Sequence, residues 1–177
     1  MKKTLGSWSG MRKYLEQEML AESLRGRVRY GCTSYAGMDG WCIFEICFDG
    51  IQMKRFSLET LNTYFIDNGY KEVAVKPFGK MEYWREFWYL YNEIPLQSRT
   101  EYTDEEFCDA LKEYRNQKIQ VSIHSENPLV RMFAVLDKRL GKNSLKKVKD
   151  TIADQPEWLQ SFYRLRMDSE LICNVQQ

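Results

Sequence analysis

Apolar residues near the start of the chain recur first at helical spacing and then at strand spacing. From Met11 to Leu24 they recur every three or four positions, with Ser9 as a cap and Gly26 as a stop, which predicts a helix. Residues 27–33 then alternate between polar and apolar side chains, which predicts a strand with one solvated face.

Two Asp-Gly pairs divide the next segment. The pair at 39–40 predicts a chain reversal before the apolar run 41–48. The pair at 49–50 predicts a tight type I′ hairpin into a more polar strand over 51–56. We therefore expect at least three antiparallel strands in a meander, with 41–48 in the middle and 51–56 at an edge. Alternation over residues 72–76 leaves a fourth strand open, with no predicted pairing.

The remaining pattern is helical. Ser57 caps a helix that Asn68 and Gly69 close, and we expect this helix to cover the sheet. Further helices are predicted over 81–93, from the capping box at 103–106, over 119–123, from Asn127-Pro128 to Gly141, from a cap at Ser144, and from about residue 157. The sequence thus predicts an α+β fold in which an N-terminal helix and a three- or four-stranded antiparallel meander precede a helical C-terminal half.

Composition is that of an ordinary folded protein. Hydrophobic residues make up 44% of the 177 residues and charged residues 29%, which is far from the composition of disordered chains. A single domain over 1–177 is expected, and a subdivision into 1–79 and 80–177 is left open. No apolar run fits a signal peptide or a membrane span, so we expect a cytoplasmic protein without membrane contact.

The residues with catalytic or metal-binding chemistry are few and dispersed. Five cysteines without a C-x-x-C pair predict reduced thiols in or near the core. Cys42 and Cys47 point to opposite faces of one predicted strand, so they cannot share a metal ion unless the strand contains a bulge. The single histidine, His124, lies in a predicted turn between helices. We therefore assign no catalytic residue, no metal site and no cofactor.

Acidic residues near the hairpins have a simpler explanation than catalysis. Asp39 and Asp49 each precede a glycine, where their side chains stabilise turns by local hydrogen bonds. Glu45 is left without such a role and is either solvent-facing or a buried acid. Whether Glu45 or His124 lines a pocket is open at this level.

Charge is polarised locally although the net charge is only +1. Residues 101–113 are acidic, and residues 131–149 are basic. The basic stretch is a predicted helical hairpin, and its candidate contacts to phosphate or nucleic acid are Arg131, Lys138, Arg139, Lys142, Lys146 and Lys147. The alternative is that the two segments face each other or a partner, because charged runs are usually solvated surface.

Aromatic residues of the helix over 81–93 spread too far around it to form one buried stripe. We expect Tyr83, Trp88 and Tyr89 to include exposed side chains. Exposed aromatic residues are frequent anchors of protein interfaces. The predicted partner is accordingly a protein, with a second copy of the chain as one form of it.

Three short segments resemble a known family. They are Trp8-Ser9 with Met11-Arg12-Lys13, then Leu24-Arg25-Gly26-Arg27-Val28, and finally Asn127-Pro128 with Arg131, Leu136-Asp137, Arg139 and Gly141-Lys142. Together they resemble a family of small bacterial hypothetical proteins, typified by a Shigella member, for which no activity is known. The resemblance implies a bacterial cytosolic protein and transfers no mechanism.

We therefore expect a non-enzymatic protein-interaction or regulatory protein. The first alternative is a nucleic-acid-binding protein that uses the basic hairpin over 131–149. The second alternative is an enzyme whose site has no familiar sequence pattern.

Overall fold

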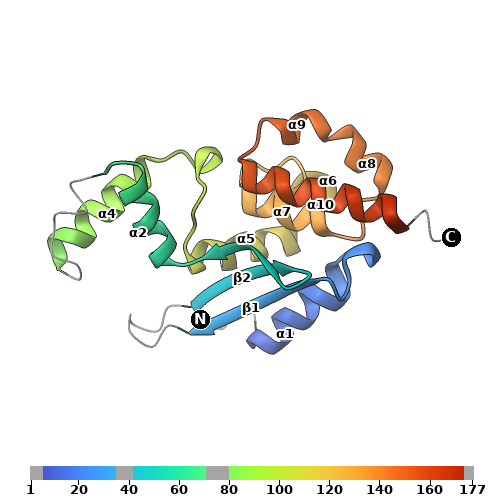
Figure 1. Ribbon diagram of the computed structural model, residues 1–177, viewed down its shortest axis with the longest axis horizontal. Helices are drawn as coiled ribbons and strands as arrows, with labels where there is room; N and C mark the ends of the chain where they lie inside the picture. Colours follow the sequence, from blue (N-terminus) through green and yellow to red (C-terminus); the bar gives the residue numbers. More distant parts are fainter. Residues whose placement is uncertain (1–5, 35–41, 71–79, 174–177) are drawn as a thin grey trace.

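The fold is α+β, with a three-stranded antiparallel sheet beneath a larger helical half (Figure 1). The computed structural model describes residues 6–34, 42–70 and 80–173. The predicted reversal at 39–40, Trp41 at the start of the middle strand, and the open fourth strand over 72–76 lie outside these residues.

The N-terminal helix is present, but it ends at Met19 and does not continue to Leu24 as predicted, because Leu20 adopts an extended ψ of 141°. It begins as α1 (Trp8–Lys13), continues as a π-helix, η2 (Tyr14–Met19), and is followed by a 3-10 turn, η3 (Glu22–Leu24). The cap is Ser7 and not Ser9 as predicted, because the Ser7 side chain accepts the Gly10 N–H at 3.2 Å.

The three strands follow the predicted meander. They are β1 (Val28–Ser34), β2 (Cys42–Phe48) and β3 (Ile51–Phe56), in the order β1-β2-β3. The hairpin between β2 and β3 has φ of 48° at Asp49 and 83° at Gly50, as a type I′ turn requires. The Asp49 carboxylate is bound by Arg27, whose Nη2 lies 2.6 Å away, and this hydrogen bond lowers the pKa of Asp49.

The Glu45 side chain has its space in the sheet because it faces a glycine of the neighbouring strand. It lies opposite Gly31 in the register of β1 and β2. A Cβ atom at residue 31 would come within 2.5 Å of the Glu45 Oε1, so the glycine makes room for this side chain. Glu45 and His124 line neither of the two cavities described below.

The prediction that the helix after β3 covers the sheet is wrong. That helix, α2 (Leu58–Asp67), is capped by Ser57 as predicted, but its buried Leu61 and Phe65 pack on α4 (Met81–Glu93). The two helices form a small aromatic cluster of their own at one end of the molecule (Figure 1). The sheet is covered instead by α1, η2 and the helix α5 (Asp104–Asn116).

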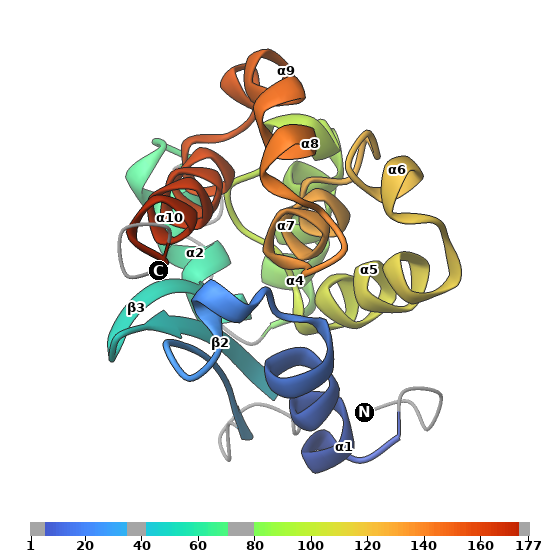
Figure 2. The same cartoon turned by 90° about the vertical axis from the view of Figure 1, so that its right-hand side faces the viewer.

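The C-terminal half surrounds one buried helix. α7 (Pro128–Leu136) lies between α10 (Glu157–Cys173) on one side and α5 with α6 (Ile119–Ser122) on the other (Figure 2). A short 3-10 turn, η4 (Leu96–Ser98), precedes α5, and α8 (Lys142–Lys147) and α9 (Lys149–Ala153) precede α10. Every side chain of α7 except Arg131 is buried, which fits a helix that is apolar on nearly all faces.

Two predicted boundaries in this half are wrong. α7 ends at Leu136 instead of continuing to Gly141, because Asp137 adopts an extended conformation and forms an antiparallel bridge with Leu20. Ser144 does not cap α8; it lies inside the helix, which begins directly after Gly141.

A buried carboxylate ties the N-terminal segment to the end of α7. Asp137 is 1% exposed and accepts a hydrogen bond from the Tyr114 hydroxyl of α5. Arg139 donates to the same carboxylate at 2.7 Å and to the Tyr114 hydroxyl oxygen at 2.9 Å. The adjacent backbone pairs with the N-terminal segment, since the Lys138 N–H donates to the Met19 carbonyl at 2.9 Å.

Removal of this carboxylate should destabilise the whole fold. Asp137→Ala leaves the buried Tyr114 hydroxyl and the Arg139 guanidinium without their acceptor, so we expect a loss of about 3 kcal/mol in the free energy of unfolding. Lys138→Ala, which changes an exposed neighbouring side chain, should alter it by less than about 0.5 kcal/mol. Urea denaturation measures both values, and an equal effect of the two substitutions contradicts the prediction.

Candidate functional site

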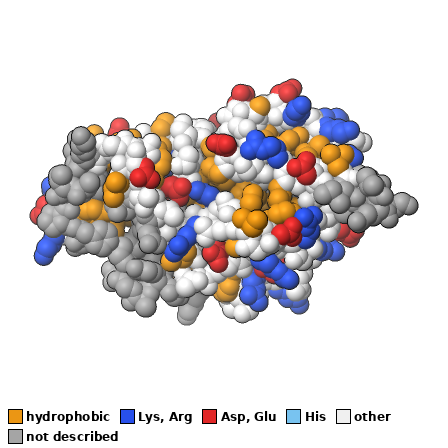
Figure 3. All heavy atoms as spheres, in the orientation of Figure 1, with side chains coloured by type: hydrophobic (Ala, Val, Ile, Leu, Met, Phe, Trp, Pro, Cys, Tyr) orange, Lys and Arg blue, Asp and Glu red, His pale blue; other side chains and the backbone are white. Residues whose placement is uncertain are grey.

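The six predicted phosphate-contacting residues divide into internally bound arginines and surface lysines. Arg131 donates to the backbone carbonyls of Ser125 and His124, and Arg139 is bound to Asp137. Lys138, Lys146 and Lys147 are exposed and Lys142 is half-buried. Figure 3 shows Lys and Arg side chains gathered over the α8–α9 end of the molecule. The basic surface therefore consists mainly of lysines, and a nucleic-acid role for it stays a prediction.

The three predicted interface residues of α4 have different environments. Tyr83 is 3% exposed and packs in the cluster with α2, so its side chain is not on the surface. Tyr89 is 61% exposed, and Trp88 is partly buried against the same cluster. Tyr83 is therefore not an exposed interface residue, and the sequence does not show this because the packing of α2 against that side of α4 is a long-range contact.

A cavity of about 400 Å³ lies where α4 meets the start of α5, and we call it the α4–α5 groove. It is lined by Trp88, Tyr91, Asn92, Thr103, Asp104, Glu105, Glu106 and Asp109. The Trp88 and Tyr91 rings lie 5.7 Å apart at 81°, so they form a corner. Half of the described lining residues are acidic and none is basic.

Glu106 organises the wall of this groove. As the third residue of α5 it completes the predicted capping box, accepting the Thr103 N–H at 2.8 Å. It also accepts the Tyr91 hydroxyl and the Arg99 Nη1, the latter at 2.7 Å. Burial, and next the Glu106 charge, raise the pKa of Tyr91, so this phenol is a hydrogen-bond donor near neutral pH.

The other acids of the groove have weaker partners. Asp104 accepts the Cys42 backbone N–H at 3.1 Å, and Asp109 pairs with Lys112 at 2.6 Å on a largely exposed surface. An aromatic corner beside several carboxylates attracts cations, because the ring faces and the acids carry the same sign of potential. The arrangement therefore suits a lysine, an arginine or another organic cation.

A second cavity of about 400 Å³ lies between β3 and α2, and we call it the β3–α2 pocket. It is lined by Arg55, Thr60, Thr63, Tyr64, Asp67, Asn68 and Glu101. Its lining carries both signs of charge, unlike that of the α4–α5 groove, and also has hydroxyl and amide groups.

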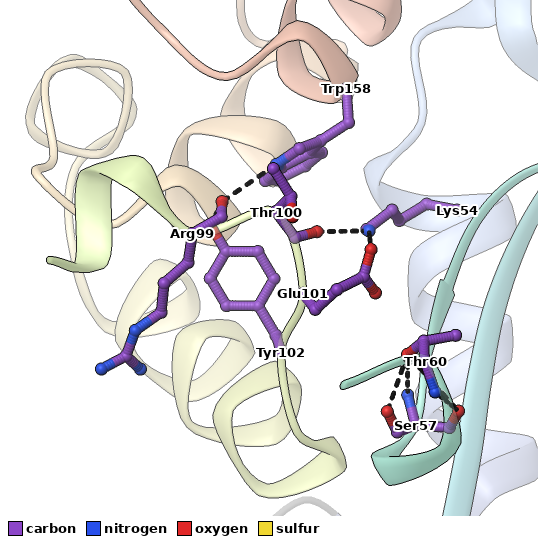
Figure 4. Close-up of polar contacts among 8 residues, drawn as sticks. All are labelled: Lys54, Ser57, Thr60, Arg99, Thr100, Glu101, Tyr102 and Trp158. Atoms are coloured by element: carbon purple, nitrogen blue, oxygen red, sulfur yellow. Dashed lines mark hydrogen bonds and ion pairs between the residues drawn. The ribbon is translucent and has the colours of Figure 1, made fainter. Parts of the chain in front are cut away.

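A buried ion pair stands beside this pocket (Figure 4). The Lys54 side chain is 9% exposed and that of Glu101 is 18% exposed, and Lys54 Nζ donates to Glu101 Oε1 at 2.9 Å. Lys54 also donates to the Thr100 carbonyl, and its ammonium lies 5.9 Å from the Trp158 ring. The sequence assigned Lys54 to a polar edge strand and did not reveal the pair, because its partner is 47 positions away.

The thiols of Cys32 and Cys108 have raised pKa values, which is the opposite of what an activated thiol shows. Cys32 lies in hydrogen-bonding contact with Cys42 and near Cys108, and burial raises the pKa of Cys32 to about 12 and that of Cys108 to about 11. No group of three potential metal ligands occurs among the described residues. His124 lies exposed in the turn after α6, where the sequence placed it.

Within the described ranges, no helix combines the length and the apolar character needed to cross a membrane. A protein-family model described as the SF0329 protein family matches residues 7–167. No curated protein matches the chain, and no solved structure does.

The Lys54–Glu101 pair gives a stability prediction. Lys54→Met keeps the apolar stem but leaves the Glu101 carboxylate buried without its cation, so we expect a loss of about 3 kcal/mol in the free energy of unfolding. Lys54→Met combined with Glu101→Gln removes both charges and should recover much of this loss. Urea denaturation tests this, and a double variant no more stable than the single one contradicts it.

The raised thiol pKa values predict slow alkylation of the native protein. At about pH 8, Cys32 and Cys108 stay protonated, and the thiol form is a poor nucleophile. Both should resist iodoacetamide in the folded protein and react once it is unfolded in guanidinium chloride, as peptide mass spectrometry can measure. Equal labelling in the two states would show that burial does not protect them.

Proposed function

The chain belongs to the SF0329 protein family, and we propose that it is a non-enzymatic protein that binds a basic segment of a partner protein in the α4–α5 groove. A bacterial origin and a cytoplasmic location, which the resemblance of its sequence implies, are part of the same proposal. The single observation that carries it is the corner of Trp88 and Tyr91 among four carboxylates.

The chemistry of the groove supports a cationic side chain as the bound group. Arg99 lies with its guanidinium 4.1 Å from the Tyr91 ring centre and pairs with Glu106, so the chain itself already uses this mode of recognition. A lysine or arginine from a partner would meet the same combination of ring and carboxylate at Trp88, because Asp104 and Glu105 also line the groove.

Exposed apolar side chains on α2 and α4 support a macromolecular partner over a small cation. On the two helices that build this end of the molecule, Met81 is 81% exposed, Tyr89 is 61% exposed and Ile66 is 50% exposed. Large exposed apolar side chains are typical of protein interfaces, where they add contact area around a central anchor.

The geometry supports binding over catalysis and over nucleic acid. Glu106 accepts three hydrogen bonds, from Thr103, Tyr91 and Arg99, so its carboxylate is occupied by partners within the chain. Phosphate groups would be repelled by the carboxylates of the groove, and two of the six basic candidates are bound internally.

Binding of short synthetic peptides tests this proposal. A fluorescent peptide rich in lysine and arginine should bind the full chain, and binding should weaken as salt rises, whereas a glutamate-rich peptide of equal length should not bind. Trp88→Ala should weaken binding roughly thirtyfold, which corresponds to about 2 kcal/mol.

Val121→Ala is the control, because it removes an exposed apolar side chain of α6 that does not line the groove. Circular dichroism confirms that both variants are folded. Equal affinity for basic and acidic peptides, or equal effects of the two substitutions, would overturn the proposal. Sedimentation of the chain alone tests whether the partner is a second copy. In that case the chain self-associates, the association weakens as salt rises, and Trp88→Ala abolishes it.

A further inference from the structure

We propose that the β3–α2 pocket binds a free amino acid, with the ligand ammonium at Glu101 and the ligand carboxylate at Arg55. This pocket is separate from the α4–α5 groove and shares no lining residue with it. Its volume of about 400 Å³ is at the lower end of the range for small-molecule sites, which suits a compact ligand.

The strongest observation is an unsatisfied carboxylate oxygen. Glu101 Oε1 is bound by Lys54, but Glu101 Oε2 is buried and has no hydrogen-bond partner in the described part of the chain. Figure 4 shows this oxygen on the side away from Lys54, toward Thr60, which also lines the pocket. Buried polar atoms nearly always have a partner, so an oxygen in this position calls for a donor supplied from the pocket.

The Lys54–Glu101 pair fixes the direction of this acceptor. Lys54 is held by the Thr100 carbonyl as well as by Glu101, so the carboxylate cannot rotate without losing a buried ion pair. A preset acceptor of this kind binds its ligand without a cost for ordering the side chain.

The charges of the lining select the ligand class. Arg55 supplies a guanidinium, which matches a carboxylate with two parallel hydrogen bonds and has donors enough to keep other partners. Asp67 adds a second acid, so a purely anionic ligand would be repelled. A ligand with both groups can pair its ammonium with Glu101 and its carboxylate with Arg55 at the same time.

The remaining lining groups favour a polar amino acid side chain. Thr63 and Tyr64 contribute hydroxyl groups. The Asn68 amide nitrogen donates to the backbone carbonyl of Tyr64 at 2.8 Å, so the Asn68 amide oxygen points away from that carbonyl. These groups offer both donors and acceptors to the ligand side chain.

The test is binding of the common free amino acids to the full chain, measured by saturation-transfer NMR and isothermal titration calorimetry. At least one polar amino acid should bind. The matching amine without a carboxylate and the matching acid without an amine should each bind at least about tenfold more weakly. Binding of none of the amino acids at millimolar concentration overturns the proposal, and so does equal binding of a neutral monosaccharide.

Variants place the ligand in the pocket. Arg55→Gln and Thr63→Val should each weaken binding, and Glu101→Gln should weaken it most, whereas Arg25→Gln, a change far from the pocket lining, should leave it unchanged. If Glu101→Gln fails to fold by circular dichroism, Arg55→Gln carries the test. Unchanged affinity in a folded Arg55→Gln protein overturns the proposal.

Discussion

The fold depends on the partners that surround one buried carboxylate, that of Asp137. Asp137 ends α7 and pairs through its backbone with Leu20, and its carboxylate pairs with the Arg139 guanidinium and accepts a hydrogen bond from the Tyr114 hydroxyl. Three segments that are far apart in sequence therefore meet at one point, namely the N-terminal helix, α5 and the end of α7. A charge removed from water is stable only when such partners are fixed around it, so the apolar core and this polar contact require each other.

The segment from Arg99 to Glu106 plays a similar role at the other end of the molecule. Its Arg99 and Glu106 hold Tyr91 of α4, and its Glu101 holds Lys54 of β3. The same few residues thus attach the α2–α4 cluster to the main body and contribute to the walls of both cavities. The polar contacts that position this cluster also shape the surfaces to which we assign binding.

Local signals in the sequence predicted most of the elements, and long-range contacts account for the errors. The Asp-Gly turn at 49–50, the capping box at Thr103 and the Asn127-Pro128 helix start were predicted correctly because each depends on neighbouring residues. The end of α7 was missed because Leu140 keeps the helical period, while the extended Asp137 pairs with Leu20, which is 117 positions earlier. The groove and the pocket depend on residues brought together only by the fold, so the sequence shows the acidic run and the aromatic helix as two separate features.

The position of β3 has a consequence for the behaviour of the protein in concentrated solution. In the described sheet it is an edge strand, and such strands can recruit a strand from another molecule into a growing fibril. Here the strand carries Lys54 turned inward and Arg55 beside it, and its register with β2 shifts between Ile46 and Cys47. Charge and irregular pairing of this kind disfavour intermolecular strand addition, so the residues that shape the pocket also protect the chain against aggregation.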